Sequence, residues 1–291
     1  MASLKEVKAR MASVKSTGKI TSAMKMVASA KLHKAQKVTA GMLPYEERLH
    51  KTMEDFLTGS SEKGLISPLT VGHEKIRRVA IVACSSNGSL CGAFNSNAIR
   101  GFMDEYNKYL DLVGPGGIEV YPAGRKMHEA VRRAGITPAG DYSSLVDHPD
   151  YEATSALADQ FIDRYLRGEI DKVVIVYHHF KGTGSQILTA STYLPLELEA
   201  SGNSEESHDY IFEPSLDDLM QELVPRELRL RLYATILDTV TSEHAARMIA
   251  MQTATDNAEE LLGELTLTYN KSRQQAITAE LLDIMGGMQD N

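Results

Sequence analysis

Apolar residues recur at alternating steps of three and four near the start of the chain, and this spacing predicts an amphipathic helix. No proline occurs between Ser3 and Met42, and Gly18 is the only internal breaker before Gly41. After a stutter near Gly18 the apolar stripe resumes with a lysine, Lys31, on it. The stripe comprises Leu4, Val7, Met11, Val14, Ile20, Met24, Val27 and Lys31, beside a neighbouring track of Ala28, Leu32 and Ala35.

The same spacing is longer and more regular at the other end of the chain, between Pro225, the last proline, and the pair Gly286–Gly287. Its members are Leu237, Thr241, His244, Met248, Met251, Thr255, Ala258, Leu262, Leu265, Tyr269, Ser272, Ala276 and Ala279. Such a sustained repeat predicts a coiled-coil partner. About 60 helical residues span roughly 90 Å, whereas a compact globule of this chain length is about 50 Å across. We therefore expect this helix to protrude, with the N-terminal helix packed antiparallel against it.

Residues 76–214 have a different pattern, in which short apolar runs alternate with amphipathic stretches. The candidate strands are 77–85, 118–124, 172–180 and 185–196, and the candidate helices are 94–110, 125–134 and 151–168. This alternation predicts a mainly parallel sheet with helices on its faces. The expected fold class is α/β: a long antiparallel coiled coil of the N- and C-terminal helices with an inserted, mainly parallel α/β domain. The expected domains are 1–57, 76–214 and 215–291.

Composition and charge narrow the class of protein. An apolar content of 43% with 24% charged residues is typical of a soluble globular chain. No run of about 18 consecutive apolar residues, the length that a spanning helix needs, is present, and the N-terminus has no apolar signal core, so we expect a cytoplasmic chain. The net charge is −8, yet residues 1–40 hold nine lysines and arginines against one acid. This basic arm favours an acidic partner, but it has no aromatic residue and one arginine, which argues against nucleic acid.

The middle of the chain offers few candidates for chemistry. The loop CSSNGSLCGAFN contains Gly88 and Gly92, but their spacing fits neither the dinucleotide motif nor the P-loop, so a structural turn is favoured over a phosphate site. His178 and His179 would point to opposite faces of a strand and would not share a metal ion. The Ser, Glu and His of SEHAAR (242–247) diverge around a helix and form no nucleophile–base pair. We expect no catalytic residue, no cofactor and no metal.

Two stretches carry a resemblance to a known family. ITSAMKMVASAKLHKAQ (20–36) and SEHAARMIAMQTATDNAEELLGELTLTYNKSRQQAITAELLDIMGG (242–287) closely resemble the gamma subunits of F-type ATP synthases. GSLCGAFN, LPYEE and YIFEPS agree more loosely, and the resemblance covers essentially the full length. It implies a non-catalytic rotor shaft that turns inside a hexamer of alternating alpha and beta subunits. Such a shaft couples ion flow through the membrane c-ring to ATP synthesis or hydrolysis on the beta subunits.

The resemblance also implies partners and contact residues. The partners are the alpha, beta and epsilon subunits and the c-ring, with no nucleic acid and with membrane association only through the complex. The implied location is peripheral, on the cytoplasmic face of a bacterial cell membrane. Positions that match beta-subunit contacts are Met24, Lys25, Lys31, Lys34, Arg273, Gln274, Thr278 and Glu280. Positions that match the region near the c-ring and epsilon are Tyr45, Tyr210, Phe212 and Glu213. A lysine on the stripe fits a shaft with two surfaces, because its methylenes can lie along the seam while its ammonium extends outward.

One loop departs from the family pattern. Where relatives commonly read DRGLCG, this chain reads NGSLCG, which removes an acid and an arginine before Leu90. Cys84 and Cys91 are the only cysteines, so a disulfide framework, a zinc site and thiol regulation are not expected. Two alternatives stay open: a coiled-coil scaffold with a non-catalytic α/β domain, and a nucleotide-using enzyme, although the sequence shows no phosphate loop and no catalytic cluster for the latter.

Overall fold

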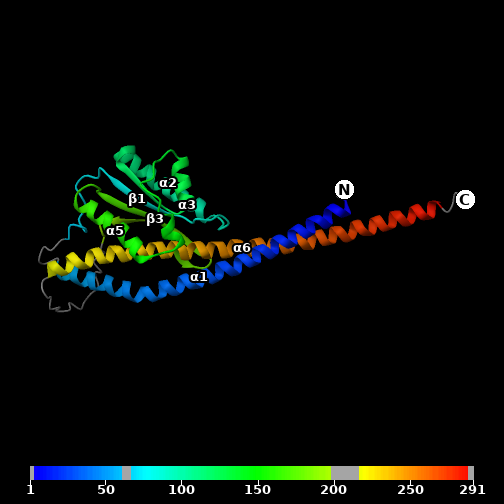
Figure 1. Cartoon of the computed structure of the whole chain (residues 1–291), viewed down its shortest axis with the longest axis horizontal. Helices are drawn as coiled ribbons and strands as arrows, with labels where there is room; N and C mark the ends of the chain where they lie inside the picture. Colours follow the sequence, from blue (N-terminus) through cyan, green and yellow to red (C-terminus); the bar gives the residue numbers. More distant parts are fainter. Residues whose placement is uncertain (1–2, 61–66, 198–215, 288–291) are drawn as a thin grey trace. The chain divides into compact units, whose positions relative to one another are not determined.

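The computed structural model describes residues 3–60, 67–197 and 216–287. They fall into two compact units: the described residues of 1–29 and 247–291 form the first, and those of 30–246 form the second. Two long helices, α1 (Leu4–Ser60) and α6 (Leu216–Gly287), contribute residues to both units (Figure 1). The long helices predicted at the two ends of the chain are therefore confirmed.

The second unit is built on a four-stranded sheet with the strand order β2-β1-β3-β4. Its strands are β1 (Val79–Cys84), β2 (Ile118–Ala123), β3 (Lys172–Gly182) and β4 (Ser185–Leu194). β1 pairs in parallel with both β2 and β3, and β4 returns antiparallel to β3. Every residue of β1 is buried, as expected for the central strand of a sheet that is covered on both faces. The mainly parallel sheet is confirmed at the predicted positions.

Helices cover both faces of this sheet (Figure 1). The shorter elements are α2 (Phe94–Val113), the 3-10 turn η1 (Pro115–Gly117), α3 (Arg125–Arg133), α4 (Ser143–Asp147) and α5 (Tyr151–Leu166). One core lies between the sheet and α2 and α3, with Phe102 and Met127 fully buried. The other core joins α5 to parts of α1 and α6 through Met53, Phe161 and Leu228. The part of α1 around Met53 and the part of α6 around Leu228 supply side chains to this second core. These parts of the two long helices therefore belong to the α/β unit.

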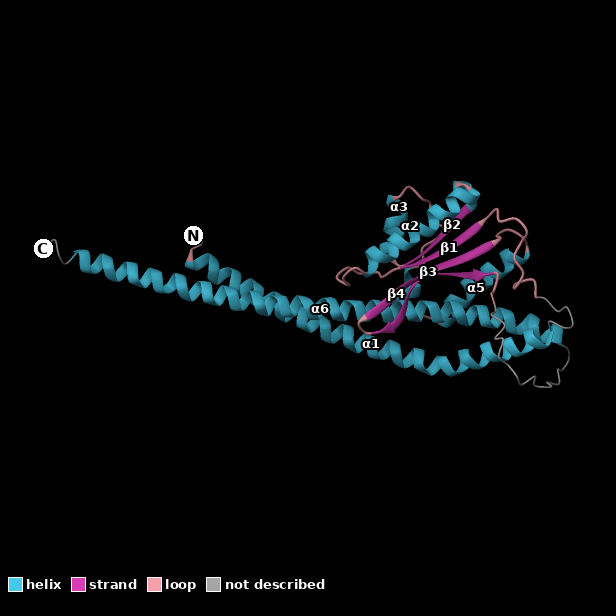
Figure 2. Cartoon of the chain, turned by 180° about the vertical axis from the view of Figure 1, so that it is seen from behind, coloured by secondary structure: helices cyan, strands magenta, loops and turns pink. Residues whose placement is uncertain are grey.

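The first unit is an antiparallel pair of helices formed by the outer parts of α1 and α6 (Figures 1 and 2). The hydroxyls of Thr21 and Thr255 lie 2.8 Å apart across the seam. One turn earlier on α1, a Cβ placed on Gly18 would lie 3.4 Å from the Cβ of Ala258. Since position 18 faces 258 and 21 faces 255, the helices run in opposite directions. Among the described residues of this unit, the buried apolar ones are Val7, Ala28, Met251 and Leu265.

On α1 the predicted stripe is wrong at Ile20, Val27 and Lys31, whereas Met24 is half-buried and the neighbouring track of Ala28, Leu32 and Ala35 is buried or half-buried as predicted. Ile20 and Val27 are 60% and 58% exposed, and Lys31 is also exposed. The seam instead runs through Gly18 and Thr21. Small side chains let two helix backbones approach closely, so a glycine and a threonine mark the seam at this level and Ile20 points outward. Lys31 therefore does not interrupt a buried stripe.

The C-terminal half of the seam agrees with its prediction. Within the first unit, the predicted positions Met248, Met251, Thr255, Ala258, Leu262, Leu265, Tyr269, Ser272 and Ala276 are all buried or half-buried. Ala279, the last member of the pattern, is exposed. The spacing of the Thr21–Thr255 contact places Leu4, the first residue of α1, opposite Ser272. Residues 273–287 of α6 therefore extend past the beginning of α1.

Candidate partner-binding surfaces

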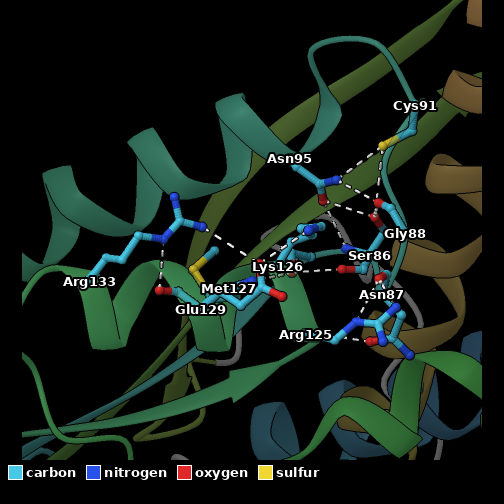
Figure 3. A network of polar contacts seen from close by, with 11 residues as sticks. Ser86, Asn87, Gly88, Cys91, Asn95, Arg125, Lys126, Met127, Glu129 and Arg133 are labelled. Carbon is cyan, nitrogen blue, oxygen red and sulfur yellow. Dashed lines mark hydrogen bonds and ion pairs between the residues drawn. The ribbon is translucent and has the colours of Figure 1, made fainter.

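The loop that follows β1 lies where an α/β nucleotide-binding protein would hold phosphate, and its contacts show what occupies that place (Figure 3). The amide of Arg125, the first residue of α3, donates to Oδ1 of Asn87 at 2.8 Å. The amide of Lys126 donates to the carbonyl of Ser86 at 3.2 Å, and that of Met127 to Oγ of Ser85 at 2.8 Å. An anion at the beginning of α3 would need these same amides. The loop after β1 already uses them, so its contacts with α3 are structural.

Asn87, the first residue of NGSLCG, contacts two other segments of the α/β unit. Besides accepting from the Arg125 amide, it donates through Nδ2 to the carbonyl of Ser143 at 2.9 Å. Its own carbonyl accepts from Nε and Nη2 of the Arg125 side chain at 3.1 and 2.7 Å. Asparagine at this position therefore ties three segments together through its neutral amide and its carbonyl.

The rest of the loop is held by Asn95 at the beginning of α2. Its Nδ2 donates to the carbonyl of Gly88 at 3.0 Å and to the sulfur of Cys91 at 3.2 Å, while its Oδ1 accepts from the Ser86 amide at 3.0 Å (Figure 3). These contacts support Leu90, which has a φ of 69° and is 60% exposed. The loop thus presents an apolar side chain outward from a fixed backbone.

The histidines and the serine considered above as candidates for metal binding or catalysis make structural contacts. His178 is buried and stacks on Phe94 with ring centroids 4.3 Å apart, whereas His179 is half exposed and its Nδ1 lies 2.7 Å from Oδ2 of Asp238. The two histidines point to opposite faces, as predicted. Oγ of Ser242 donates to the carbonyl of His178 at 3.0 Å rather than to a neighbouring base.

The two thiols are buried and unoxidised. Burial raises the pKa of the Cys84 thiol to about 12, so this thiol stays protonated. Among the residues that the structure describes, no group of three or more His, Cys, Asp or Glu side chains could hold a metal ion. Within these same residues, no helix is long and apolar enough to cross a membrane.

We expect the buried His178 to make the folded protein less stable in acid. Burial lowers its pKa from the ordinary value of 6.5 to about 4, so the unfolded chain takes up the proton first as the pH falls. The unfolding free energy should therefore decrease by about 2 kcal/mol between about pH 7 and about pH 5 through this group. His178→Phe, which keeps an aromatic ring against Phe94, should lack this part of the loss in urea unfolding at the two pH values. Equal losses in both proteins would contradict the assignment.

The residues that match beta-subunit contacts on α1 differ in exposure. In the first unit, Met24 and Lys25 are half-buried, and in the second unit Lys31 and Lys34 are exposed. Sequence reasoning missed that Ile20, Met26 and Val27 are exposed apolar residues of the first unit, at 60%, 64% and 58%. The signal that could have found them was the small-residue seam at Gly18 and Thr21, which turns Ile20 away from α6.

The contact positions near the end of α6 lie in the stretch that extends past the beginning of α1. Arg273, Gln274, Thr278 and Glu280 are all exposed. The hydroxyl of Thr278 donates back to the carbonyl of Gln274 at 2.9 Å, a contact within the helix. The same stretch carries exposed apolar side chains: Ile277, Leu281, Leu282 and Met285. An apolar face on a helix without a packed neighbour in its own unit is typical of a partner-binding surface.

The positions assigned to the c-ring and epsilon region are only partly within the structure. Tyr45 is 44% exposed, and the guanidinium carbon of Arg226 lies 5.6 Å from its ring centroid. This cation–π contact orients the ring between α1 and α6 inside the second unit. Tyr210, Phe212 and Glu213 lie outside the described residues.

Comparisons with known proteins agree with this architecture. The sequence model of the ATP synthase family matches residues 3–289. The ATP synthase gamma chain of Phocaeicola vulgatus is 52% identical over 290 residues, and that of Bacteroides fragilis is 52% identical over 291 residues, each covering 99% of both chains. The gamma chain of Flavobacterium johnsoniae is 40% identical over 287 residues, with 99% of this chain and 98% of the relative covered.

Solved structures show the same fold. A chain of the Euglena gracilis mitochondrial ATP synthase rotor superposes with a TM-score of 0.62 at 18% identity, covering 94% of this chain and 98% of the other. A chain of the Tetrahymena thermophila mitochondrial ATP synthase central stalk and c-ring gives a TM-score of 0.56, covering 81% of this chain and 99% of the other, at 18% identity.

These matches define the class first: the protein is a subunit of an ATP synthase complex. More narrowly, the chain belongs to the ATP synthase gamma-chain family. Its role is that of the gamma subunit of the rotary complex, which confirms the resemblance seen in the sequence and replaces the alternative of a generic coiled-coil scaffold.

Proposed function

We propose that the chain is the non-catalytic rotating shaft of a bacterial F-type ATP synthase. The α1/α6 helix pair would turn inside a hexamer of alternating alpha and beta subunits, and the α/β unit would stand on the c-ring beside epsilon. The observation that carries this proposal is the seam of the first unit. Gly18 and Thr21 lie on the seam where α1 meets α6, and the large apolar residues Ile20, Met26 and Val27 of the same unit are exposed, where a partner can cover them.

A shaft of this kind acts as a ligand that the beta subunits bind differently in each conformation. It can shift their nucleotide affinities only by making different contacts with each of them. The exposed surface of α1 offers groups for such contacts, because exposed apolar side chains alternate with lysines along it. Lys25, Lys31 and Lys34 are proposed to pass acidic segments of the beta subunits, and Met24 to provide an adaptable apolar contact.

The end of α6 is proposed to be the second beta-contacting surface. Arg273, Gln274, Thr278 and Glu280 lie on the stretch that extends past α1, where their side chains are exposed. Both polar and apolar groups are available there, which suits a surface that must slide past successive subunits. Tyr45, and by resemblance Tyr210, Phe212 and Glu213, are proposed to belong to the surface that meets the c-ring and epsilon.

The proposal also gives a location. The relatives are bacterial gamma chains, and solved structures that share the fold come from ATP synthase assemblies that include the c-ring. We propose that this chain is peripheral, on the cytoplasmic face of the cell membrane, and held there only through the complex. Purification of the tagged chain from native membranes in mild detergent tests this. ATPase activity should accompany the eluate and be absent from the chain alone, and activity in the isolated chain would overturn the non-catalytic role.

Lys31→Glu tests the cationic surface directly. Because Lys31 is exposed, the reversal should change the unfolding free energy by less than about 0.5 kcal/mol. It should nevertheless lower the ratio of ion pumping to ATP hydrolysis in membrane vesicles by about two- to ten-fold, since reversing a charge at an interface costs on the order of 1 kcal/mol. Lys31→Arg keeps the charge and should behave like the wild type. Normal hydrolysis and normal pumping with Lys31→Glu would remove Lys31 from the interface.

A further inference from the structure

Polar contacts tie α6 to the strands β3 and β4 within the second unit (Figure 2). The hydroxyl of Tyr193 in β4 donates to the main-chain carbonyl of Leu228 at 2.8 Å, and both residues are fully buried. Farther along α6, the side chains of Asp238 and Ser242 contact β3. Positions 228, 238 and 242 lie within about 80° of one another around a helix with 3.6 residues per turn. One side of α6 is therefore held by the two strands.

The C-terminal half of β3 has a strand beside it on one side only, among the described residues. β1 pairs with β3 as far as Val176, whereas the pairing of β4 with β3 continues beyond that residue. The amide of Phe180 donates to Oδ1 of Asp238 at 2.7 Å. The carbonyl of His178 accepts from Oγ of Ser242 at 3.0 Å. Because these two strand residues are two positions apart, their main-chain groups point to the same side, and α6 takes the place of a strand there.

Asp238 makes the stronger of these two contacts, because both of its carboxylate oxygens are used. While Oδ1 accepts from the Phe180 amide, Oδ2 lies 2.7 Å from Nδ1 of His179. The side chain of Asp238 is 20% exposed, and that of His179 is 53% exposed. Hydrogen bonds to a carboxylate are shorter and stronger than those between neutral groups. A mostly buried carboxylate that is bound at two points fixes both the distance and the rotation of its helix relative to the strand.

We propose that Asp238, supported by Ser242, is the positioning residue that makes α6 turn with the sheet. We call the contacts of these two residues with β3 the β3–α6 joint. The proposal rests on the shaft function proposed above, in which rotation of the α/β unit must reach the α1/α6 helix pair. Apolar packing is non-directional, so it resists separation of the helix from the sheet more than rolling of the helix about its own axis. Hydrogen bonds to the main chain of a sheet are directional and resist rolling as well.

The place of the joint along α6 supports this role. The second unit ends at Ala246, and α6 continues from there into the first unit as one helix as far as Gly287. Asp238 and Ser242 occupy the last turns of α6 before that boundary. Rotation that the sheet imposes on the helix at this point is passed on through the unbroken main-chain hydrogen bonds of the helix.

Asp238→Ala, in membrane vesicles that contain the assembled complex, tests the joint under load. Ion pumping driven by ATP hydrolysis should begin at a rate close to that of the wild type, when little ion gradient opposes rotation. As the gradient builds up, the opposing torque should exceed what the weakened joint can hold. The steady-state gradient should be lower by about two-fold or more at equal hydrolysis, because losing two hydrogen bonds to a charged group favours the opened joint by at least ten-fold. A wild-type steady-state gradient would overturn the proposal.

Asp171→Ala is the matched control, because Asp171 has the same chemistry away from α6. Its Oδ1 lies 2.7 Å from Nδ1 of His73, and its Oδ2 accepts from the amides of Arg77 and Arg78 at 2.8 and 2.9 Å. Both aspartate variants should lower the urea midpoint for unfolding of the full chain, whereas only Asp238→Ala should lower the steady-state gradient. Equal losses of gradient in the two variants would show that Asp238 only stabilises the fold, and would overturn the proposal.

Two milder variants keep the test decisive if Asp238→Ala does not assemble. Asp238→Asn retains an oxygen acceptor for the Phe180 amide and should sustain a gradient close to that of the wild type. Ser242→Ala loses only the bond to the His178 carbonyl and should lower the gradient by a smaller factor, again without a change in the initial rate. A wild-type gradient in Ser242→Ala would then overturn the joint. Failure of the wild-type complex to pump ions at all would instead overturn the shaft function on which the joint rests, so the two failures are distinguishable.

Discussion

Gly124→Ala is expected to lower the unfolding free energy of the α/β unit by about 3 to 5 kcal/mol, because two separate strains act at this residue. Its φ is 115°, a conformation that side-chain-bearing residues rarely adopt. A Cβ there would lie 2.3 Å from the carbonyl oxygen of Ser85 and 2.7 Å from its Oγ. Ser85 cannot move away easily, because its amide donates to the carbonyl of Ala123 at 2.8 Å and its hydroxyl oxygen accepts from the amide of Met127 at 2.8 Å.

The control for this prediction is Gly168→Ala. Gly168 also has a positive φ, 67°, but nothing lies within 4 Å of the added methyl. Its replacement should cost only about 1 to 2 kcal/mol, the price of the left-handed conformation. Both variants can be measured by urea unfolding followed by circular dichroism. If the two losses were equal, the close packing of the β1–α2 loop against the beginning of α3 would not limit stability.

Most of the α/β unit could be predicted from the sequence because its elements are locally encoded. A strand buried on both faces, such as Val79–Cys84, is a continuous apolar run, and α2 and α5 follow as amphipathic stretches of matching length. The seam positions of α6 could be predicted equally well, because the alternating spacing of three and four residues is maintained along the helix. The resemblance to gamma subunits rested on these same stretches, and the family match confirms it.

The features that could not be predicted depend on contacts between distant residues. The cap on α3 joins Asn87 to Arg125, and no local pattern links these two positions. The place of β4 at the edge of the sheet depends on the strand order, which puts β4 outside β3. The seam of α1 was misread at Ile20 because apolar size was taken as the mark of burial, whereas the close approach of α6 selects for small residues.

Gly18→Leu is therefore expected to open the helix pair of the first unit. A Cβ at this position is already 3.4 Å from Ala258, so a methyl group fits, but the further carbons of leucine must push the helices apart. Overpacking of this kind costs about 1 to 3 kcal/mol. The amides of α1 near Thr21 should then exchange roughly ten- to hundred-fold faster in the purified complex, and the Thr21–Thr255 contact should be lost.

Two variants separate crowding at the seam from the loss of a glycine. Gly18→Ala should leave exchange unchanged or slow it, because alanine favours a helix over glycine by about 1 kcal/mol and the methyl only reaches ordinary contact. Gly263→Leu introduces the same large side chain on α6 with nothing within 4 Å of its Cβ, and should be neutral or mildly stabilising. Faster exchange with Gly263→Leu as well would show that bulk anywhere on the pair is harmful. Faster exchange with Gly18→Leu alone would show that the helix pair depends on a close approach of α1 and α6 at this position, which a leucine side chain prevents.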